Sequence, residues 1–113
     1  MIRLTVLYNL ADDQDEDEFL KWRLTEHQES NASMPGVLHT DFARIDEAWP
    51  PGAERPYRFM TAVEWPDRAT FEKAFYDPEE QAALKENLKK LKDPVFLISE
   101  ILIDETTKEA EPA

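Results

Sequence analysis

The chain has 113 residues, of which 42% are apolar and 11% aromatic, a composition that suits one domain with a hydrophobic core. Its formal net charge is -12 and its longest basic run is Lys89-Lys90, so we expect no binding to nucleic acid or anionic lipid. It contains no cysteine, which excludes disulfides, thiolate catalysis and cysteine-based zinc sites.

The N-terminal residues suggest a strand, Ile2–Tyr8, rather than a leader sequence, so we expect no signal peptide. No apolar run approaches the roughly 20 residues that a membrane-spanning helix needs. We therefore predict a soluble, cytoplasmic protein that has no membrane partner.

The acidic segment after the first strand predicts a helix over about residues 16–30. Asp15 and Glu18 have the spacing of a capping pair, and acidic side chains favour the N-terminal end of a helix dipole. The 3.6-residue period predicts that one helix face carries Leu20, Leu24, His27 and Asn31, with Phe19 and Trp22 beside them.

Turn and cap residues divide the rest of the chain. Pro35-Gly36 ends the first connection, Asp77 and Pro78 form a helix start, and Asp93-Pro94 is predicted to end that helix. The predicted elements are strands over 37–45 and 57–65 around a proline-rich loop, a helix from Pro66-Asp67, a helix over 79–91 and a strand over 95–103.

The resulting order β-α-β-β-α-β predicts a ferredoxin-like α+β fold, in which an antiparallel four-stranded sheet has its helices on one face. We assign this domain to residues 1–104 and predict a flexible acidic tail over 105–113. Both side-chain registers of the last two strands are rich in apolar residues, although a sheet face that meets water is usually polar. A homodimer that packs sheet against sheet explains this pattern, and a monomer with a ligand groove is the alternative.

Four motifs occur in a characteristic order. They are Ile2-Arg3-Leu4-Thr5-Val6-Leu7-Tyr8, Phe19-x-x-Trp22-x(4)-His27-x(7)-Pro35-Gly36, Ala62-Val63-Glu64-Trp65 and Asp77-Pro78-Glu79-x-Gln81. In these motifs the chain resembles the EthD-like members of the dimeric α/β-barrel superfamily, over about residues 2–103. It departs from them at Glu29, where the family often has proline.

The resemblance implies a dimer with one pocket per subunit between helices and sheet. It also implies small organic ligands, often aromatic or polyketide-like. Enzymatic relatives carry out cofactor-free decarboxylation, cyclisation or oxidation, and many relatives have no known activity. We accordingly expect no cofactor.

His27 is the main catalytic candidate, because an imidazole has a reference pKa of about 6.5 and exchanges protons near neutral pH. Glu64 or Glu100 would orient it or take a proton itself. The alternatives are a His27 bonded to a backbone carbonyl and glutamates paired across the sheet. The possible partners of those glutamates are Arg3, Arg44 and Arg58.

Four aromatic residues are candidates for the ligand pocket, although aromatic residues at such spacings are also common in cores. They are Tyr8, Trp22, Tyr57 and Trp65. His39 and Asp41 share a strand face but lack the spacing of a known metal motif, so we predict no metal site.

These residues leave three functional hypotheses. The first is an enzyme of secondary or degradative metabolism that uses acid–base chemistry of the decarboxylation or cyclisation type. The second is a non-catalytic small-molecule-binding or accessory protein with the same pocket. The third is a cofactor-independent or haem-linked monooxygenase, which would bring Asn9 and Trp65 together at the ligand.

Overall fold

The structure is a computed structural model that describes residues 1–106 and confirms the ferredoxin-like α+β class. The strands are β1 Ile2–Leu10, β2 His39–Arg44, β3 Phe59–Trp65 and β4 Leu91–Glu100. The helices are α1 Glu16–Trp22, π-helical η1 Arg23–His27, α2 Gln28–Ala32, α3 Arg68–Phe75, α4 Pro78–Asn87 and 3-10 η2 Leu88–Lys90. Most of the predicted tail, 107–113, lies outside the described residues.

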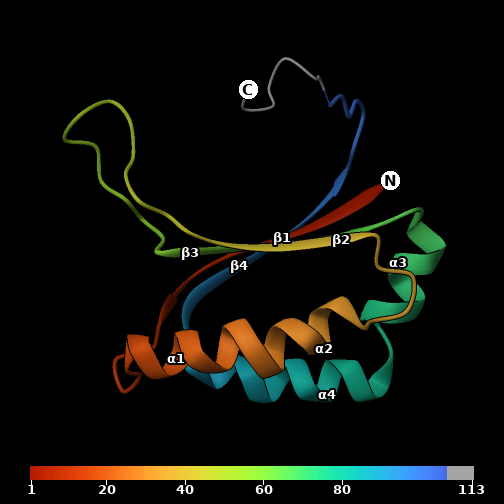
Figure 1. The fold of residues 1–113 in the computed structure, drawn as a ribbon, viewed down its shortest axis with the longest axis horizontal. Coiled ribbons are helices and arrows are strands. Elements are labelled where there is room, and N and C mark those ends of the chain that lie inside the picture. The colour runs from red at the N-terminus through yellow and green to blue at the C-terminus, as the bar shows by residue number, and fades with distance from the viewer. Residues whose placement is uncertain (107–113) are drawn as a thin grey trace.

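The four strands form one antiparallel sheet in the order β2-β3-β1-β4. Helices α1, α2 and α4 lie against one face, and α3 lies at one end of the sheet (Figure 1). We call the other face the open face. The loop between β2 and β3 and residues 101–106 both extend on its side of the sheet (Figure 1).

Aspartate caps begin three of the helices. The Asp15 carboxylate accepts a hydrogen bond from the Glu18 backbone N–H at 3.1 Å, and Asp77 accepts from Glu79 and Glu80 at 3.1 and 3.2 Å. Both caps were predicted from the sequence. A further cap, Asp67, accepts from the Thr70 backbone at 2.8 Å.

The predicted apolar face of the first helix is wrong at Leu24, which is 61% exposed. The helix contains a π-helical segment, Arg23–His27, whose wider turn shifts the positions that face the sheet. Phe19 and Arg23 are buried there instead, at 4% and 1% exposure.

The predicted start of the last strand is also wrong, because Asp93-Pro94 lies inside β4 instead of ending a helix. Leu7 pairs with Val95 and Asn9 with Lys92, so Asp93 and Pro94 together oppose a single residue of β1. This is a β-bulge in an edge strand, a place where proline is tolerated. Asp93 adopts a positive φ of 53° there.

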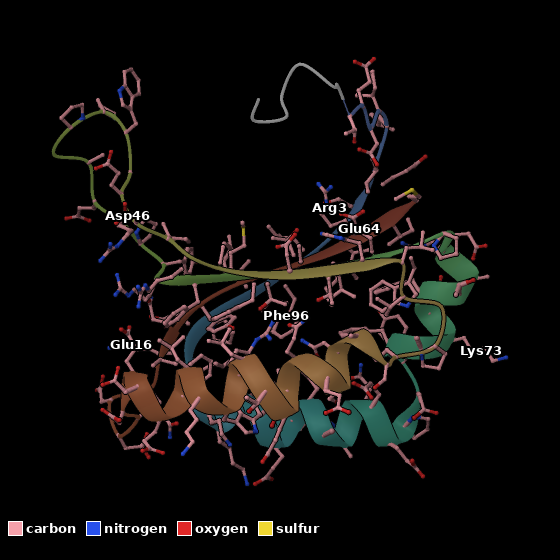
Figure 2. All side chains as sticks on the ribbon, viewed as in Figure 1. Arg3, Glu16, Asp46, Glu64, Lys73 and Phe96 are labelled. Carbon is pink, nitrogen blue, oxygen red and sulfur yellow. The ribbon has the colours of Figure 1, made fainter. Side chains whose placement is uncertain are left out.

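The core lies between the sheet and its helices. Alternate residues of β1 and β3 are buried on this side, and Phe96 of β4 also points toward the helices (Figure 2). The buried side chains of these two strands on the helix side are Ile2, Leu4, Val6, Tyr8, Phe59, Thr61, Val63 and Trp65, and β3 also buries Ala62 and Glu64 on the other side.

The open face is apolar at only one end, so the prediction of an apolar second face is half right. The cross-strand partners Ala43, Met60, Leu7 and Val95 form an apolar row. The partners His39, Glu64, Arg3 and Ser99 form a polar row four residues away along each strand, with a mixed row between the two. Arg3 and Glu64 pair on this side of the sheet, away from the helices (Figure 2).

Within residues 1–106, none of the helices combines the length and the apolar character required to cross a bilayer.

Candidate functional site

A cavity of about 110 Å³ lies between the sheet and the helices. Most of its wall is apolar, from Leu4, Val6, Phe19, Trp22, Met34, Val63, Phe75, Ala83, Leu84, Leu91 and Phe96. Its polar lining comes from Tyr8, Arg23, His27, Ser30, Asn31, Thr61, Glu80 and Asn87. An apolar lining with a few convergent polar groups is typical of small-molecule sites, but this cavity is smaller than the roughly 300 Å³ at which such sites usually begin.

Arg23 is the most deeply buried charged side chain of this site, with 1% exposure. Its Nη1 donates to Oε1 of Gln28 at 2.8 Å, and its Nη2 donates to Oγ1 of Thr61 at 3.3 Å. The guanidinium also lies over the Phe42 ring, 4.3 Å from the ring centroid, a favourable cation–π geometry. Burial lowers the pKa of Arg23, but an arginine remains protonated at neutral pH.

Tyr8 extends from β1 toward the same cavity. Its hydroxyl lies 3.2 Å from Oγ1 of Thr61. Burial raises the pKa of Tyr8, while the Thr61 hydrogen bond and the nearby Arg23 charge partly offset that rise. The phenol is therefore neutral at physiological pH and can donate a hydrogen bond.

His27 lines the cavity, and its imidazole stacks on Trp22 with ring centroids 4.4 Å apart. No described residue forms a hydrogen bond with it, so it is not held by a backbone carbonyl among residues 1–106. Burial lowers the pKa of His27 from its usual 6.5 to about 4, and the Arg23 and Lys90 charges contribute to the shift. The imidazole is neutral at pH 7.

Neither predicted carboxylate partner reaches His27. Glu64 lies on the open face, where it accepts hydrogen bonds from Nε and Nη2 of Arg3 at 3.1 and 3.0 Å. Glu100 pairs with Ile2 at the end of β4, is exposed, and does not line the cavity. Glu64 points away from His27 because adjacent residues of a strand face opposite sides of the sheet, and its neighbour Val63 faces the helices.

The predicted aromatic ligand residues separate into two groups. Tyr8 and Trp22 line the cavity, whereas Tyr57 lies outside it, before β3. Trp65 is fully buried in the core, donates from Nε1 to the Pro35 carbonyl at 3.1 Å, and packs edge-on against Phe71.

Asn9 and Trp65 do not meet, because they belong to opposite ends of the paired strands β1 and β3. The Asn9 amide instead holds the loop before β3. Its Nδ2 donates to the Pro56 carbonyl at 2.8 Å, and its Oδ1 accepts from the Arg58 backbone at 2.9 Å.

His39 and Asp41 pair on the open face, with Nε2 and Oδ2 3.1 Å apart. In the part of the chain that the structure describes, no group of three or more His, Cys, Asp or Glu side chains is placed to hold a metal ion.

Sequence reasoning missed Arg23 and Glu80 as pocket residues. A signal for Arg23 was available, because Phe19, Arg23, His27 and Asn31 follow one another at steps of four. Glu80 lies in the first turn of α4, where an acidic residue is ordinary and predicts no pocket. Burial raises the pKa of Glu80, and the neighbouring Asp77 charge adds to the effect.

A model of the family described as REDY-like protein HapK matches residues 2–102. The chain belongs to the HapK family. This match, together with a solved EthD family structure, confirms the predicted resemblance to EthD-like dimeric α/β-barrel proteins. No curated protein sequence matches the chain.

Three solved structures illustrate the fold shared by this HapK-family chain. An ethyl tert-butyl ether D (EthD) family protein from Bacillus halodurans is 21% identical, with a TM-score of 0.73 over 90% of this chain and 99% of its own. A dimeric ferredoxin-like protein of unknown function from Thermobifida fusca is 21% identical, with a TM-score of 0.67 over 88% and 90%. A variant of SnoaB, a cofactor-independent oxygenase from Streptomyces nogalater, is 9% identical, with a TM-score of 0.67 over 91% and 94%.

Proposed function

We propose that this chain is a cofactor-free enzyme that moves a proton on a small, largely apolar molecule, with His27 as the general base or acid. One observation carries the proposal: the His27 imidazole lines an apolar cavity and forms no hydrogen bond with any described residue. Its ring nitrogens are therefore available to a ligand or to water.

The ionisation state of His27 is compatible with the role of base. With its pKa lowered to about 4, the imidazole is unprotonated at neutral pH and has a nitrogen available to accept a proton, but the same shift makes it a weaker base than an ordinary histidine. In the proposed step, a C–H bond next to a carbonyl breaks, its electron pair moves onto the carbonyl oxygen, and the proton goes to His27. Ring closure by aldol-type condensation passes through such an enolate, whereas in decarboxylation the C–C bond to the leaving CO₂ breaks instead and the resulting enolate must then be protonated.

Other pocket residues supply what this step requires. The Tyr8 hydroxyl and the Asn31 amide line the cavity and can donate hydrogen bonds to the enolate oxygen. The surrounding apolar wall keeps water away from the reacting carbon.

We further propose that two copies associate through their open faces. The apolar row ends at the edge strand β4, where Leu97 of the adjacent row is 47% exposed, and Trp49 is 86% exposed on the loop before β3. The similar Thermobifida fusca protein is described as dimeric. A second copy presents the same apolar row and the same exposed loop, which suits a twofold interface.

The competing function is a non-catalytic binding protein. The observation that favours it is the missing orienting group: neither Glu64 nor Glu100 reaches His27, and a general base is usually held in place by a further hydrogen bond. The monooxygenase alternative depended on a cluster of Asn9 with Trp65, and these residues lie apart.

Deuterium exchange tests the enzymatic proposal without knowledge of the true substrate. Phenylacetone is small, apolar and has exchangeable hydrogens beside its carbonyl. In D₂O, the wild-type protein should accelerate their exchange, as followed by NMR, and His27→Gln should not. Lys73→Gln, which changes an exposed residue of α3, is the control and should match the wild type. Acceleration that persists in His27→Gln assigns the chemistry elsewhere, and no acceleration across a panel of aryl ketones favours the binding protein.

A further inference from the structure

We propose that Arg23 makes the inner end of the pocket, beside Tyr8 and Thr61, a subsite for the carboxylate of a small apolar acid. The inference deepens the proposed function, because it names the ligand class of the same pocket and rests on that pocket being a ligand site.

The first argument is the absence of a counterion. Arg3, Arg44, Arg58 and Arg68 each form an ion pair with a glutamate, and the exposed Arg55 donates to two backbone carbonyls instead. Arg23 is more deeply buried than any of them, yet it forms no ion pair with a carboxylate among residues 1–106. The chain has 25 acidic residues, so a missing partner is not explained by a shortage of carboxylates.

The second argument is the energetics of a buried cation. An ionised group removed from water is unfavourable unless it is paired or hydrogen-bonded. Arg23 forms two hydrogen bonds, both to neutral oxygens, and stacks over one aromatic ring. A guanidinium has further N–H donors in a fixed fork that fits a carboxylate, so a bound carboxylate would provide the missing partner.

The third argument is the local charge. The charged or titratable groups at the pocket are Arg23, His27, Tyr8, Glu80 and, over the Trp22 ring at 4.8 Å, Lys90. At neutral pH His27 and Tyr8 are uncharged, so the pocket lining holds one cation, Arg23, and one carboxylate, Glu80, while the Lys90 cation lies just outside the lining. Two cations in or beside this pocket, in a chain of net charge -12, favour an anionic ligand at Arg23.

A carboxylate bound at Arg23 would also change the pKa of His27, the proposed base. The Arg23 charge is one cause of the low pKa of His27, and a carboxylate bound to Arg23 cancels part of that charge. His27 would then become a stronger proton acceptor only when an acidic ligand is in place. The pocket would thus activate its base for acids in preference to neutral molecules.

Benzoate and benzamide are matched probes, because they share size and shape and differ in charge. Isothermal titration calorimetry at neutral pH should show benzoate binding to the wild type about tenfold or more tightly than benzamide. Arg23→Met should remove this preference and leave benzamide affinity nearly unchanged. Arg23→Lys should retain part of it, since lysine keeps the charge and loses the fork. Arg58→Met is the control, because Arg58 pairs with Glu16 outside the pocket.

Equal binding of benzoate and benzamide to the wild type overturns the inference, as does a benzoate preference that survives in Arg23→Met. If Arg23→Met does not fold, the wild-type comparison and an NMR titration of His27 still decide, because benzoate but not benzamide should raise its pKa. Exchange of phenylacetone, a neutral compound, tests the proposed function separately. Exchange without a benzoate preference rejects only the carboxylate subsite, and a preference without exchange rejects only the enzyme.

Discussion

The imidazole of His27 stacks on the indole of Trp22, with ring centroids 4.4 Å apart and ring planes inclined by 25°. The two residues belong to successive segments of one helix, Trp22 at the end of α1 and His27 at the end of the π-helical η1. The Nζ atom of Lys90 lies over the Trp22 ring of this stack, 4.8 Å from the ring centroid. This packing orients the imidazole by contact with a ring, in place of a hydrogen bond to a carboxylate.

His27→Ala should therefore abolish exchange activity with little loss of stability. The variant removes a partly buried, neutral ring whose stacking contributes about 1 kcal/mol, and it leaves no charged group unpaired. Circular dichroism melts of wild type and variant should differ by only a few degrees. A large drop in Tm, or exchange at the wild-type rate, contradicts a catalytic role for His27.

The same residue should make stability depend on pH in a defined direction. The folded-state pKa of His27 is about 4, below the unfolded value near 6.5, so below pH 6.5 the unfolded chain binds a proton that the folded chain does not. The His27 contribution is fully present above that pH and is lost as the pH falls toward 4. One pKa unit corresponds to about 1.4 kcal/mol, so a fall from 6.5 to about 4 sets an upper limit of about 3.4 kcal/mol, and partial exposure of His27 reduces it.

Urea denaturation at about pH 7.5 and about pH 4.5 measures this effect. The wild type should lose more unfolding free energy between these pH values than His27→Gln does, because the glutamine does not titrate. Contributions of the carboxylates cancel in the comparison. Identical losses in the two proteins contradict a lowered pKa.

Local chemistry made parts of this fold predictable. The caps Asp15 and Asp77 act on backbone groups within three residues, so their sequence neighbours suffice to identify them. The start of β4 was not predictable in this way. Asp93-Pro94 looks like a helix terminator, and only its pairing with the distant strand β1 makes it a bulge.

The site residues likewise differ in whether local sequence patterns could identify them. His27 could be placed by spacing, because helix period and motif order both point to it. Glu64 could not, since strand alternation gives two faces but does not say which one the helices cover. Arg23 was missed because a charged residue in a mostly polar helix normally faces water, and this expectation outweighed the four-residue spacing that Arg23 shares with Phe19 and His27.

The open face makes a prediction about assembly. Leu97→Asp places a charge beside the apolar row and should weaken a sheet-to-sheet dimer by tenfold or more, about 1.4 kcal/mol. Leu24→Asp is a matched control, because Leu24 is also an exposed leucine, at 61% against 47%, but lies on the helix layer. Native mass spectrometry should find wild type and Leu24→Asp at twice the 13.2 kDa chain mass and Leu97→Asp shifted to single chains. A monomeric wild type rejects the proposed interface.

Gly36 makes a prediction about how the first connection packs on α3. It has a φ of +78°, and a Cβ at this position would overlap the Cγ2 methyl of Thr70. Gly36→Ala should therefore lower the unfolding free energy by about 2 kcal/mol, about half from the left-handed backbone and the rest from the clash. Thr70→Ser removes the clashing methyl. The double variant, Gly36→Ala with Thr70→Ser, should therefore recover the loss caused by the clash but not the loss caused by the left-handed backbone. A double-mutant cycle from urea denaturation measures this coupling, and strictly additive losses contradict the contact.

At Gly36 the loss of glycine should destabilise the fold, whereas at Asp93, in the β-bulge of β4, the introduction of glycine should stabilise it. A non-glycine residue at a φ of 53° is held in the left-handed region, which costs roughly 1 kcal/mol, less for aspartate because its short side chain tolerates it. Asp93→Gly should raise the urea midpoint slightly, by up to about 1 kcal/mol in unfolding free energy, whereas Asp93→Val should lower it because a β-branched side chain is disfavoured there. If Asp93→Val were as stable as the wild type, β4 would have to pair with β1 without the bulge.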